Sequence, residues 1–293
     1  MDITTFMVTV FCLIEDWIGS QRVRQRGPQP TVYDSEVLTL EVVGEFLGLD
    51  TDTAIYSYFR RYWSDWFPRL MRIHRTTFAR QAANLWRWKE QLWQALLTQI
   101  EQEPILVVDS FPLPLARFGR AYRCQRLRAW AGWGYDDSAK QLFWGLRAHV
   151  LMAHPGVIVR LALHPADVHD RWVADDLLAG LTPAWVLGDT NYWSPTLQAD
   201  LWRKGVSLLT PRKSSRKRAR HPWPRWLTHA RRRIETVASQ LVERWHAKRV
   251  WARDPWHLCS RWLRKILSHT FVVFLGQQFG LASPLRFADL ITL

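Results

Sequence analysis

The sequence predicts an all-α N-terminal domain followed by an α/β domain, and the change of pattern near Pro104 separates the two. Before Pro104, apolar residues recur at helical spacing and strand signals are few. After it, short β-branched runs alternate with helical segments, which is typical of a mixed sheet flanked by helices. A third observation bears on the partner: the net charge is +14, and many of the 19 tryptophans stand beside Arg or Lys. This composition favours nucleic acid, although a generally basic, tryptophan-rich composition without a DNA partner is the alternative.

The composition excludes several classes of protein. With 48% apolar and 23% charged residues, the 293-residue chain is neither disordered throughout nor a coiled coil. Three scattered cysteines, Cys12, Cys124 and Cys259, do not form a disulfide framework or a paired-cysteine zinc site, which fits a reducing cytoplasm. The apolar run from Phe6 to Ile14 lacks a basic start, and no run reaches the length of a membrane span. We therefore expect a soluble, cytoplasmic protein.

Residues 1–102 are expected to form the helical domain. A helix that begins near Asp34 is followed by the turn "GLD" and by a second helix with Ile55 and Phe59 on its apolar face. This pattern fits either a helix-turn-helix or a plain three-helix unit, and both readings stay open. We expect this domain to bind DNA or to mediate dimerisation.

Residues 103–293 are expected to form the α/β domain, with a mixed sheet of about five strands. The run "ILVVD" predicts a short buried strand that ends at Asp109, and "QLFWGLRAHVLMA" and "VIVRLALHP" meet at a Pro-Gly turn as an antiparallel pair. The strands "AWVLGD" and "VSLLTP" each follow a helix, and Ser194 with Pro195 marks the start of the second helix. Two long helices close the domain after a basic loop at 212–226.

Three acids stand where such a sheet gathers functional groups. Asp109 and Asp189 follow strands, and Glu235 lies on a late helix that can pack across the sheet. Converging carboxylates repel one another unless divalent cations neutralise them, and oxygen ligands are those that Mg²⁺ prefers. Two such ions support in-line displacement at phosphorus, which is phosphodiester chemistry. Taken singly, each acid has a structural reading as a turn cap or a helical ion pair.

The order of elements and several motifs resemble one known family. The motifs are "ILVVDSFPLP", "GLRAHVLM", "LALHPADVHDRW", "VLGDTNYWS", "LLTPRK" and "RRRIETVASQL". Together they resemble the DDE transposases of bacterial insertion sequences, in the nine-eight-two group of the insertion-sequence-four-like superfamily. The resemblance covers most of the chain and is strongest from about Leu106 to Phe274. It implies an α/β RNase H-like catalytic domain behind the helical N-terminal domain.

The resemblance also implies roles for the three acids. Asp109, Asp189 and Glu235 would be the metal ligands and catalytic residues, holding two Mg²⁺ ions for which Mn²⁺ can substitute. Asp189 stands 80 positions after Asp109, and Glu235 stands 46 positions after Asp189, so no large domain is inserted before the glutamate. The chain departs from the superfamily at Thr228 and Val242, where Tyr and Lys are often found. Without that Tyr and Lys, the resemblance does not imply a hydroxyl or lysine contact to the cut DNA strand, and a reduced activity stays open.

Other polar motifs surround these acids. In "HPADVHD" we expect Asp170 to cap the next helix and His169 to support the site through hydrogen bonds, which is favoured over metal binding. Arg231 and Arg232 can share the face of Glu235, either as a phosphate clamp or as a helical ion pair. Trp130, Trp133, Tyr135 and Trp144 flank the first strand, and both core packing and contact with distorted DNA stay open. The residues expected to contact DNA are Arg212, Lys213, Arg216, Lys217, Arg218, Arg220, Arg231 and Arg232.

These observations lead to a functional hypothesis with two alternatives. The hypothesis is a transposase that binds the terminal inverted repeats of its element and the target DNA as double-stranded partners, with a homodimer when DNA is bound. It would cleave the element ends and join the 3′ hydroxyl to the target by two-metal phosphoryl transfer. The alternatives are an RNase H-like nuclease that only hydrolyses and an inactive relative that only binds DNA. Repeat sequence, target preference, second-strand route and free oligomeric state depend on more than the sequence.

Overall fold

The computed structural model describes residues 1–19, 23, 28–154, 156–181, 183–211, 225–249, 251–281 and 283–291. For residues 225–230 it describes the backbone alone. The chain forms two compact units. Unit 1 combines Met1–Ile100 with Gln240–Leu293, and unit 2 is Glu101–Ser239. The C-terminal segment thus belongs to the same compact unit as the N-terminal helices. The domain bounds 1–102 and 103–293 stay predictions.

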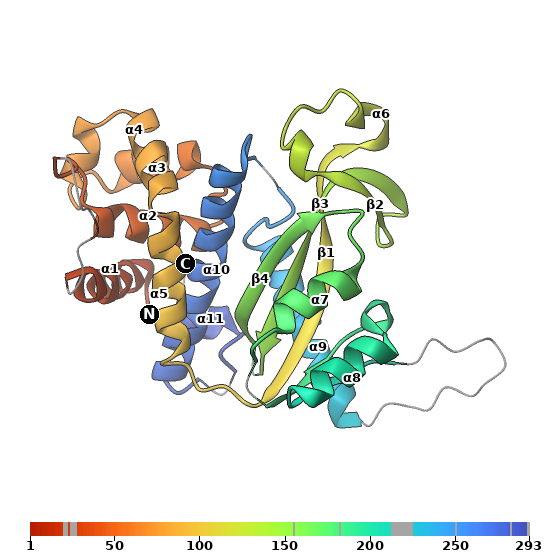
Figure 1. Ribbon diagram of the computed structural model, residues 1–293. Helices are drawn as coiled ribbons and strands as arrows, with labels where there is room; N and C mark the ends of the chain where they lie inside the picture. Colours follow the sequence, from red (N-terminus) through yellow and green to blue (C-terminus); the bar gives the residue numbers. More distant parts are fainter. Residues whose placement is uncertain are drawn as a thin grey trace. The chain divides into compact units, whose positions relative to one another are not determined.

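Unit 1 is entirely helical in the residues that the structure describes. Its helices are α1 (Ile3–Gly19), α2 (Asp34–Phe46), α3 (Asp52–Tyr62), α4 (Arg75–Asn84), α5 (Trp86–Leu97), α10 (Pro255–Gln278) and α11 (Phe287–Leu290), with a 3-10 turn η1 at Pro68–Arg72. Helix α10 is buried along most of its length and packs on α2, α4 and α5 (Figure 1). The all-α N-terminal region is therefore confirmed. Leu85 separates α4 from α5.

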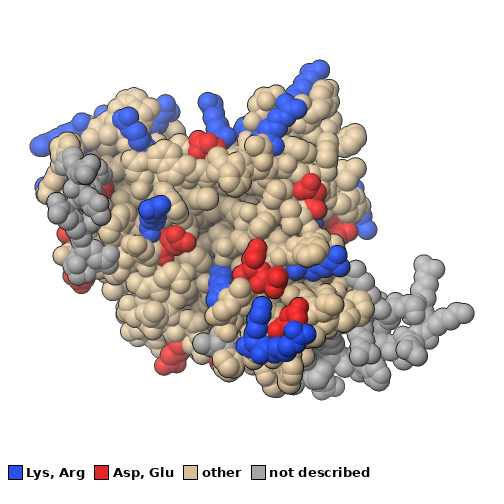
Figure 2. Space-filling model, viewed as in Figure 1, with Lys and Arg blue, Asp and Glu red and all other residues tan. Residues whose placement is uncertain are grey.

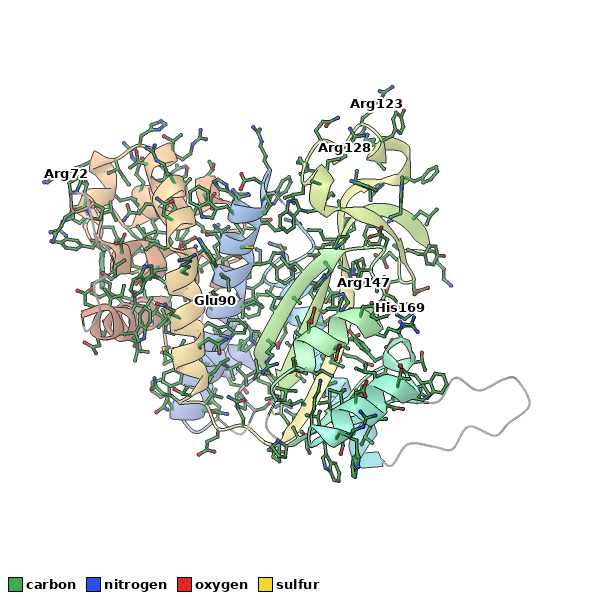
Figure 3. All side chains as sticks on the ribbon, in the orientation of Figure 1. Arg72, Glu90, Arg123, Arg128, Arg147 and His169 are labelled. Carbon is green, nitrogen blue, oxygen red and sulfur yellow. The ribbon has the colours of Figure 1, made fainter. Side chains whose placement is uncertain are left out.

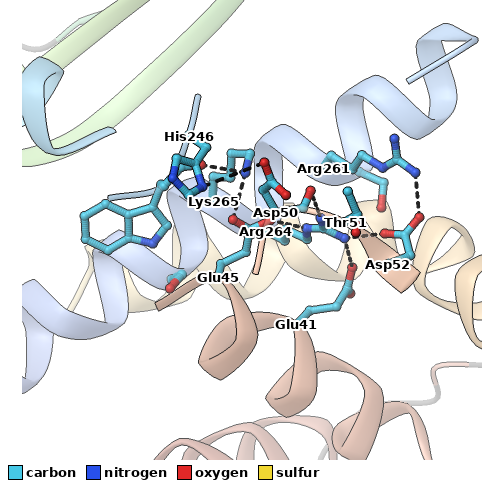
Figure 4. Close-up of polar contacts among 12 residues, drawn as sticks. Glu41, Glu45, Asp50, Thr51, Asp52, His246, Arg261, Arg264 and Lys265 are labelled. Carbon is cyan, nitrogen blue, oxygen red and sulfur yellow. Dashed lines mark hydrogen bonds and ion pairs between the residues drawn. The ribbon is translucent and has the colours of Figure 1, made fainter. Parts of the chain in front are cut away.

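Buried charge explains why the C-terminal segment joins unit 1. Lys89 Nζ on α5 donates to Glu41 on α2 and to Ser260 Oγ on α10, both at 2.7 Å. Arg264 on α10 pairs with Glu45 and Asp52, and Lys265 Nζ lies 2.7 Å from Glu45 Oε2 (Figure 4). Charges this deeply buried need partners, so α10 and the N-terminal helices form one folding unit.

Unit 2 is built on a six-stranded mixed sheet in the described residues. The strands are β1 (Ile105–Arg117), β2 (Gly132–Asp136), β3 (Gln141–Ala153), β4 (Val157–Pro165), β5 (Ala184–Leu187) and β6 (Val206–Leu209). β3 pairs antiparallel with β1, and its other edge is shared by β4 and β2; β5 and β6 continue the sheet parallel to β1. An antiparallel set of three long strands followed by two parallel strands, each reached through a helix, is the predicted α/β RNase H-like arrangement, and the fold class is confirmed.

Helices cover the sheet on both faces (Figure 1). α7 (Asp170–Leu178) packs on β3 and β4, and α8 (Pro195–Arg203) packs on β6. α9 (Arg225–Glu243) passes behind β1 in the view of Figure 1. Ser194 Oγ caps α8 by accepting from Leu197 N at 3.4 Å, as the sequence predicts. Short elements α6 (Phe118–Ala121), η2 (Arg128–Trp130) and η3 (Thr190–Tyr192) complete the unit.

Strand β1 is much longer than predicted and contains two prolines. The carbonyl of Ile105 accepts from the N–H of His154, on the β3 side, and the carbonyl of Pro104 accepts from the N–H of Trp185, on the β5 side. Backbone groups alternate along a strand, so those of odd-numbered residues of β1 point toward β3 and those of even-numbered residues point toward β5. Pro112 and Pro114 are even-numbered and lie beyond Val107, where the pairing with β5 ends. Their missing N–H groups therefore fall on an unpaired edge, which is where a strand tolerates proline.

No helix of the described chain is long and apolar enough to cross a membrane.

Candidate active site

Asp109 and Asp189 occupy equivalent positions on neighbouring parallel strands. The last parallel pair joins Val107 of β1 to Leu187 of β5, and each aspartate stands two residues farther along its own chain. Paired strands lie about 4.8 Å apart, so the two backbones leave the paired region side by side. The charge of Asp189 contributes to the raised pKa of Asp109, which places the two carboxylates within electrostatic reach. The expected proximity of the two strand-end acids is thus present in the structure.

Burial makes Asp109 an unusual carboxyl group. Burial is the largest cause that raises its pKa to about 6, and the negative charge of Asp189 raises it further. The backbone N–H of Ser110, which donates to Asp109 Oδ1 at 2.8 Å, and the guanidinium of Arg231 oppose this rise. Asp109 does not end its strand as predicted, because β1 continues to Arg117. Burial and a like charge are general causes of a raised carboxyl pKa, and carboxyl groups perturbed in this way are enriched at functional sites.

Asp189 is held by the turn that it starts. Its Oδ1 accepts from the backbone N–H of Asn191 at 2.8 Å, and its Oδ2 accepts from the Asn191 side chain at 3.0 Å. The residue serves as the N-cap of η3, directly after β5. These two bonds fix the side chain, so Asp189 has the role of a turn cap, and its catalytic role stays a prediction.

The sheet separates two polar environments around β1. Ser110 contacts Asp170, the first residue of α7, so the even-numbered side chains at this point of β1 face α7. Side chains alternate along a strand, and Asp109 therefore faces the other side, where α9 runs. The influence of Arg231 on Asp109 agrees with this placement, because Arg231 belongs to α9.

A buried polar cluster lies behind Asp109, on the α7 face. Ser110 Oγ donates to Asp170 Oδ2 at 3.0 Å and accepts from Arg147 Nη1 at 3.3 Å. Arg147 Nε lies 3.9 Å from Asp170 Oδ1, and Figure 3 shows Arg147 beside the start of α7. Burial raises the pKa of Asp170, while Arg147 and Ser110 lower it. We call Ser110, Arg147 and Asp170 the support cluster.

Two further buried groups adjoin the support cluster. The Tyr192 hydroxyl lies 3.3 Å from His149 Nδ1, and both side chains are fully buried. Burial, followed by the charges of Asp170 and Asp109, raises the pKa of Tyr192 well above its ordinary value. Burial lowers the pKa of His149 to about 3, and the rings of His149 and His164 are 5.9 Å apart. At neutral pH, Tyr192 and His149 are therefore uncharged.

Glu235 is the third predicted acid, and in the described residues it does not form a metal-holding group with the two aspartates. It is exposed on α9, one helical turn after Arg231. Among the described residues, no three His, Cys, Asp or Glu side chains are grouped closely enough to hold a metal ion. The structure thus brings together Asp109 and Asp189, and it places Arg231 on their side of the sheet.

The donors that are present fit a hard divalent cation. Asp109 and Asp189 offer carboxylate oxygens, and neither forms an ion pair with another described residue. The negative charge of Asp189 repels the carboxylate of the part-buried Asp109, and a bound cation would offset that repulsion. Asp109 and Asp189 are therefore the residues around which a metal site would form.

The "HPADVHD" residues have separate positions. His169, not Asp170, caps α7: its Nδ1 accepts from Arg171 N at 3.3 Å, and its side chain is exposed, as Figure 3 shows. The expectation that Asp170 caps this helix is wrong, because its carboxylate is engaged by Ser110 and Arg147. Asp167 instead lies close to Gly132 of β2.

Most of the predicted DNA contacts cannot be placed. Arg212, Lys213, Arg216, Lys217, Arg218 and Arg220 lie outside the described residues. The side chain of Thr228 is likewise outside them. Arg232 is exposed on α9, next to the half-buried Arg231.

Sequence reasoning missed the inner polar residues Ser110, Arg147, His149 and Tyr192. A signal was present for two of them. Arg147 and His149 stand two positions apart in a strand that is otherwise mostly apolar, so they share one face of a buried sheet. Polar side chains in that position need partners, which predicts a buried polar group nearby.

The family model described as "Transposase DDE domain" matches residues 99–249. Among curated proteins, no sequence matches this chain. A cryo-electron microscopy structure of the piggyBac transposase synaptic complex with hairpin DNA aligns at a TM-score of 0.47 and 11% identity, covering 97% of this chain and 76% of that one.

Proposed function

The chain belongs to the transposase DDE domain family, and from this premise we propose that it cuts and joins DNA at the ends of a bacterial insertion sequence. Its motifs favour the nine-eight-two group of the insertion-sequence-four-like superfamily. The observation that carries the proposal is the equivalent placement of Asp109 and Asp189, two residues beyond the last pair of parallel strands β1 and β5. The fold directs two carboxylates to one edge of the sheet, which suits phosphoryl transfer.

Asp109, Asp189 and Glu235 would hold the metal. Members of this family depend on divalent metal, and we propose two Mg²⁺ ions, replaceable by Mn²⁺. When bound, they supply activation of the attacking water or 3′ hydroxyl and neutralisation of the leaving oxygen. Asp109 must lose its proton first, and its raised pKa is compatible with doing so at neutral pH. Glu235 would complete the set from α9, which already brings Arg231 near Asp109.

Several groups would act without touching the reacting phosphate. The support cluster of Ser110, Arg147 and Asp170 fixes the strand that carries Asp109, and the two bonds from Asn191 orient Asp189. Partners that orient metal ligands commonly matter nearly as much as the ligands themselves. His169, which caps α7, would act only by placing Asp170.

The proposed partners are the terminal inverted repeats of the element and the target DNA. A net charge of +14 supports phosphate binding, and Arg231 and Arg232 are suited to hold a phosphate beside the site. The basic residues of 212–226 would add contacts along the backbone. Because two element ends must be brought together before joining, we propose a homodimer on DNA.

The test is cleavage of labelled DNA that carries the element's own ends, with Mg²⁺ or Mn²⁺. Wild-type protein should nick at the element end, and Glu235→Gln should bind the same DNA but cut at least a hundredfold more slowly. Exposed Glu90→Gln on α5 serves as the matched control and should cut as wild type does. Binding without cutting by the wild type, with either metal, would remove the enzyme proposal in favour of a DNA-binding relative.

A second substrate separates a transposase from a nuclease. DNA supplied with its 3′ end already cut should be joined to a plasmid target, since joining uses the same site with the 3′ hydroxyl as nucleophile. Hydrolysis of uncut ends without any joining would favour the nuclease.

A further inference from the structure

The far end of the β1–β3 ribbon carries aromatic side chains on its surface. Ring centroids of Phe118 and Trp133 are 5.6 Å apart, and those of Trp133 and Trp144 are 5.4 Å apart. Phe118 is 62% exposed and Trp133 is 43% exposed, whereas Trp144 beside them is half-buried. We call these three residues the aromatic platform. Large apolar side chains of this kind normally become buried, and a continuous exposed group of them marks an interaction surface.

Glycines on the opposite face force these rings outward. Along β2, Gly132 and Gly134 are buried, whereas Trp133 and Tyr135 are exposed. A Cβ at Gly134 would come within 2.7 Å of Phe143 and 2.8 Å of Ala166, so that face has no room for a side chain. The strand therefore packs through glycine and presents tryptophan and tyrosine to solvent. This arrangement fixes Trp133 on a paired strand of the sheet.

Four arginines stand in or beside the chain segment that joins Phe118 to Trp133. Arg117, Arg120, Arg123 and Arg128 are all exposed, and none of them forms an ion pair with a described residue. Figure 3 labels Arg123 and Arg128 at this end of unit 2, and Figure 2 shows basic side chains over the same region. The carboxylate of Asp136 is buried and accepts from the backbone N–H groups of Ser138 and Ala139.

The combination identifies the partner by its chemistry. Exposed arginines attract phosphates, and flat aromatic rings stack on bases that have lost a neighbour in the duplex. A second copy of this chain fits less well, because a self-complementary contact would bring the two sets of arginines together. We propose that the aromatic platform binds unpaired bases of DNA while the four arginines hold the adjoining phosphates.

The platform adjoins the end of the strand that carries Asp109, because Phe118 directly follows β1. Arg117, the last residue of β1, stands eight positions after Asp109, which corresponds to at most about 27 Å, or roughly eight base steps. The platform is therefore distinct from the cleavage site, and yet the same DNA can reach both. This inference rests on the proposed function only in taking DNA as the substrate, since cutting and joining create nicked and branched DNA with unstacked bases.

Binding of fluorescein-labelled DNA tests the proposal on the full chain. One duplex of about 20 base pairs is used blunt and with an unpaired single-stranded tail, long enough to exceed one binding site. Wild type should prefer the tailed form, and Phe118→Ala/Trp133→Ala should lose that preference by about tenfold while still binding the blunt duplex. Trp202→Ala is the matched control, because Trp202 is 71% exposed on α8, and it should bind as wild type does.

A second variant keeps the test valid if loss of the aromatic side chains disturbs the fold. Arg120→Ser/Arg123→Ser/Arg128→Ser removes only exposed groups, and it should weaken both DNA forms and reduce the slope of log affinity against log salt by up to about three. An unchanged tail preference in the aromatic variant would overturn the proposal. A change in oligomeric state with unchanged DNA binding would also overturn it and assign the platform to self-association.

Nicking of element ends, measured in parallel, separates this inference from the proposed function. Nicking by wild type together with an unchanged tail preference in the aromatic variant would contradict base binding by the platform and support the proposed transposase activity. Tail binding that depends on the platform, without any nicking, would support base binding by the platform and contradict the proposed DNA cleavage.

Discussion

Asp109 is energetically costly to the folded chain when no cation is bound. Its ordinary pKa is 3.8, and burial followed by the charge of Asp189 raises it to about 6. The folded state thus binds the proton more tightly than the unfolded state does. The stabilisation from protonation is complete below about pH 4 and is lost as the pH rises through 6.

A prediction follows for Asp109→Asn, which removes this titration. In EDTA at pH 8 the variant should be more stable than wild type by on the order of 1–3 kcal/mol, and the difference should disappear near pH 4. Urea unfolding at the two pH values measures it, with exposed Asp200→Asn as the control. A difference that is equal at both pH values would show that charge on Asp109 is not the cause. Added Mg²⁺ should stabilise wild type but not the variant.

Asp170 gives a second prediction at this scale. Asp170→Asn removes the carboxylate that pairs with Arg147 and accepts from Ser110, so the segment that carries Asp109 becomes less well fixed. We expect a rate of end cleavage about tenfold lower, with DNA affinity unchanged. Asp175→Asn, an exposed substitution on the same helix, should behave as wild type. Equal rates for the two variants would remove the support cluster from the account.

The sequence predicted part of this site for identifiable reasons. The β-branched run before Asp109 and the strand before Asp189 were sufficient to place both acids at one edge of a sheet. The support cluster could not be predicted in the same way, because Ser110, Arg147 and Asp170 meet only through the register of β1 with β3 and the docking of α7. The catalytic roles of Asp109, Asp189 and Glu235 stay predictions.

At the scale of elements, the ribbon formed by β1 and β3 depends on one close backbone approach. A Cβ at Gly145 of β3 would lie 2.2 Å from the carbonyl oxygen of Leu113, and a backbone atom cannot move aside as a side chain can. Gly145→Ala should therefore destabilise the protein by about 1–3 kcal/mol. Gly119→Ala, with no atom within 4 Å of its added Cβ, should change stability by less than about 0.5 kcal/mol. Thermal unfolding of both variants checks this, and equal transitions would contradict the packing described.

The elements themselves were predicted unevenly. The extents of β3 and β4 and the start of α8 were confirmed, because strand alternation, a Pro-Gly turn and a Ser-Pro cap are local signals. β2 and the second half of β1 were missed. Gly132 and Gly134 indicate a turn when they are read locally, and Pro112 and Pro114 argue against a strand. The structure shows why both segments are strands. The prolines lie where β1 is not paired with β5, and the glycines of β2 face a side of the sheet that has no room for a side chain.

At the scale of the whole molecule, the least predictable feature is the pairing of the two ends of the chain in unit 1. Glu45 and Arg264 are 219 positions apart, and no local pattern indicates that they meet. The apolar residues of α10 predict a buried helix, but they do not indicate which other helices it packs against. Helix content was therefore predictable here, whereas the assignment of residues 240–293 to a unit was not.

The buried charges of unit 1 give a prediction at this scale. Lys89→Met leaves Glu41 without its nearest cation, and we expect a loss of about 3–5 kcal/mol in the free energy of unfolding. The double variant Glu41→Gln/Lys89→Met should recover most of this loss. Arg87→Met on the same helix is exposed and should have little effect. Urea titration followed by circular dichroism measures all three, and a double variant as unstable as Lys89→Met alone would contradict the pairing.

The central claim is that Asp109 and Asp189 form the core of a divalent-metal site, and Mn²⁺ binding followed by electron paramagnetic resonance tests it most directly. Wild type should bind about two Mn²⁺ ions per chain in a way that Mg²⁺ competes with. Asp189→Asn should lose this binding, while Asp200→Asn should retain it. Mn²⁺ binding that is equal in wild type and Asp189→Asn would contradict the account.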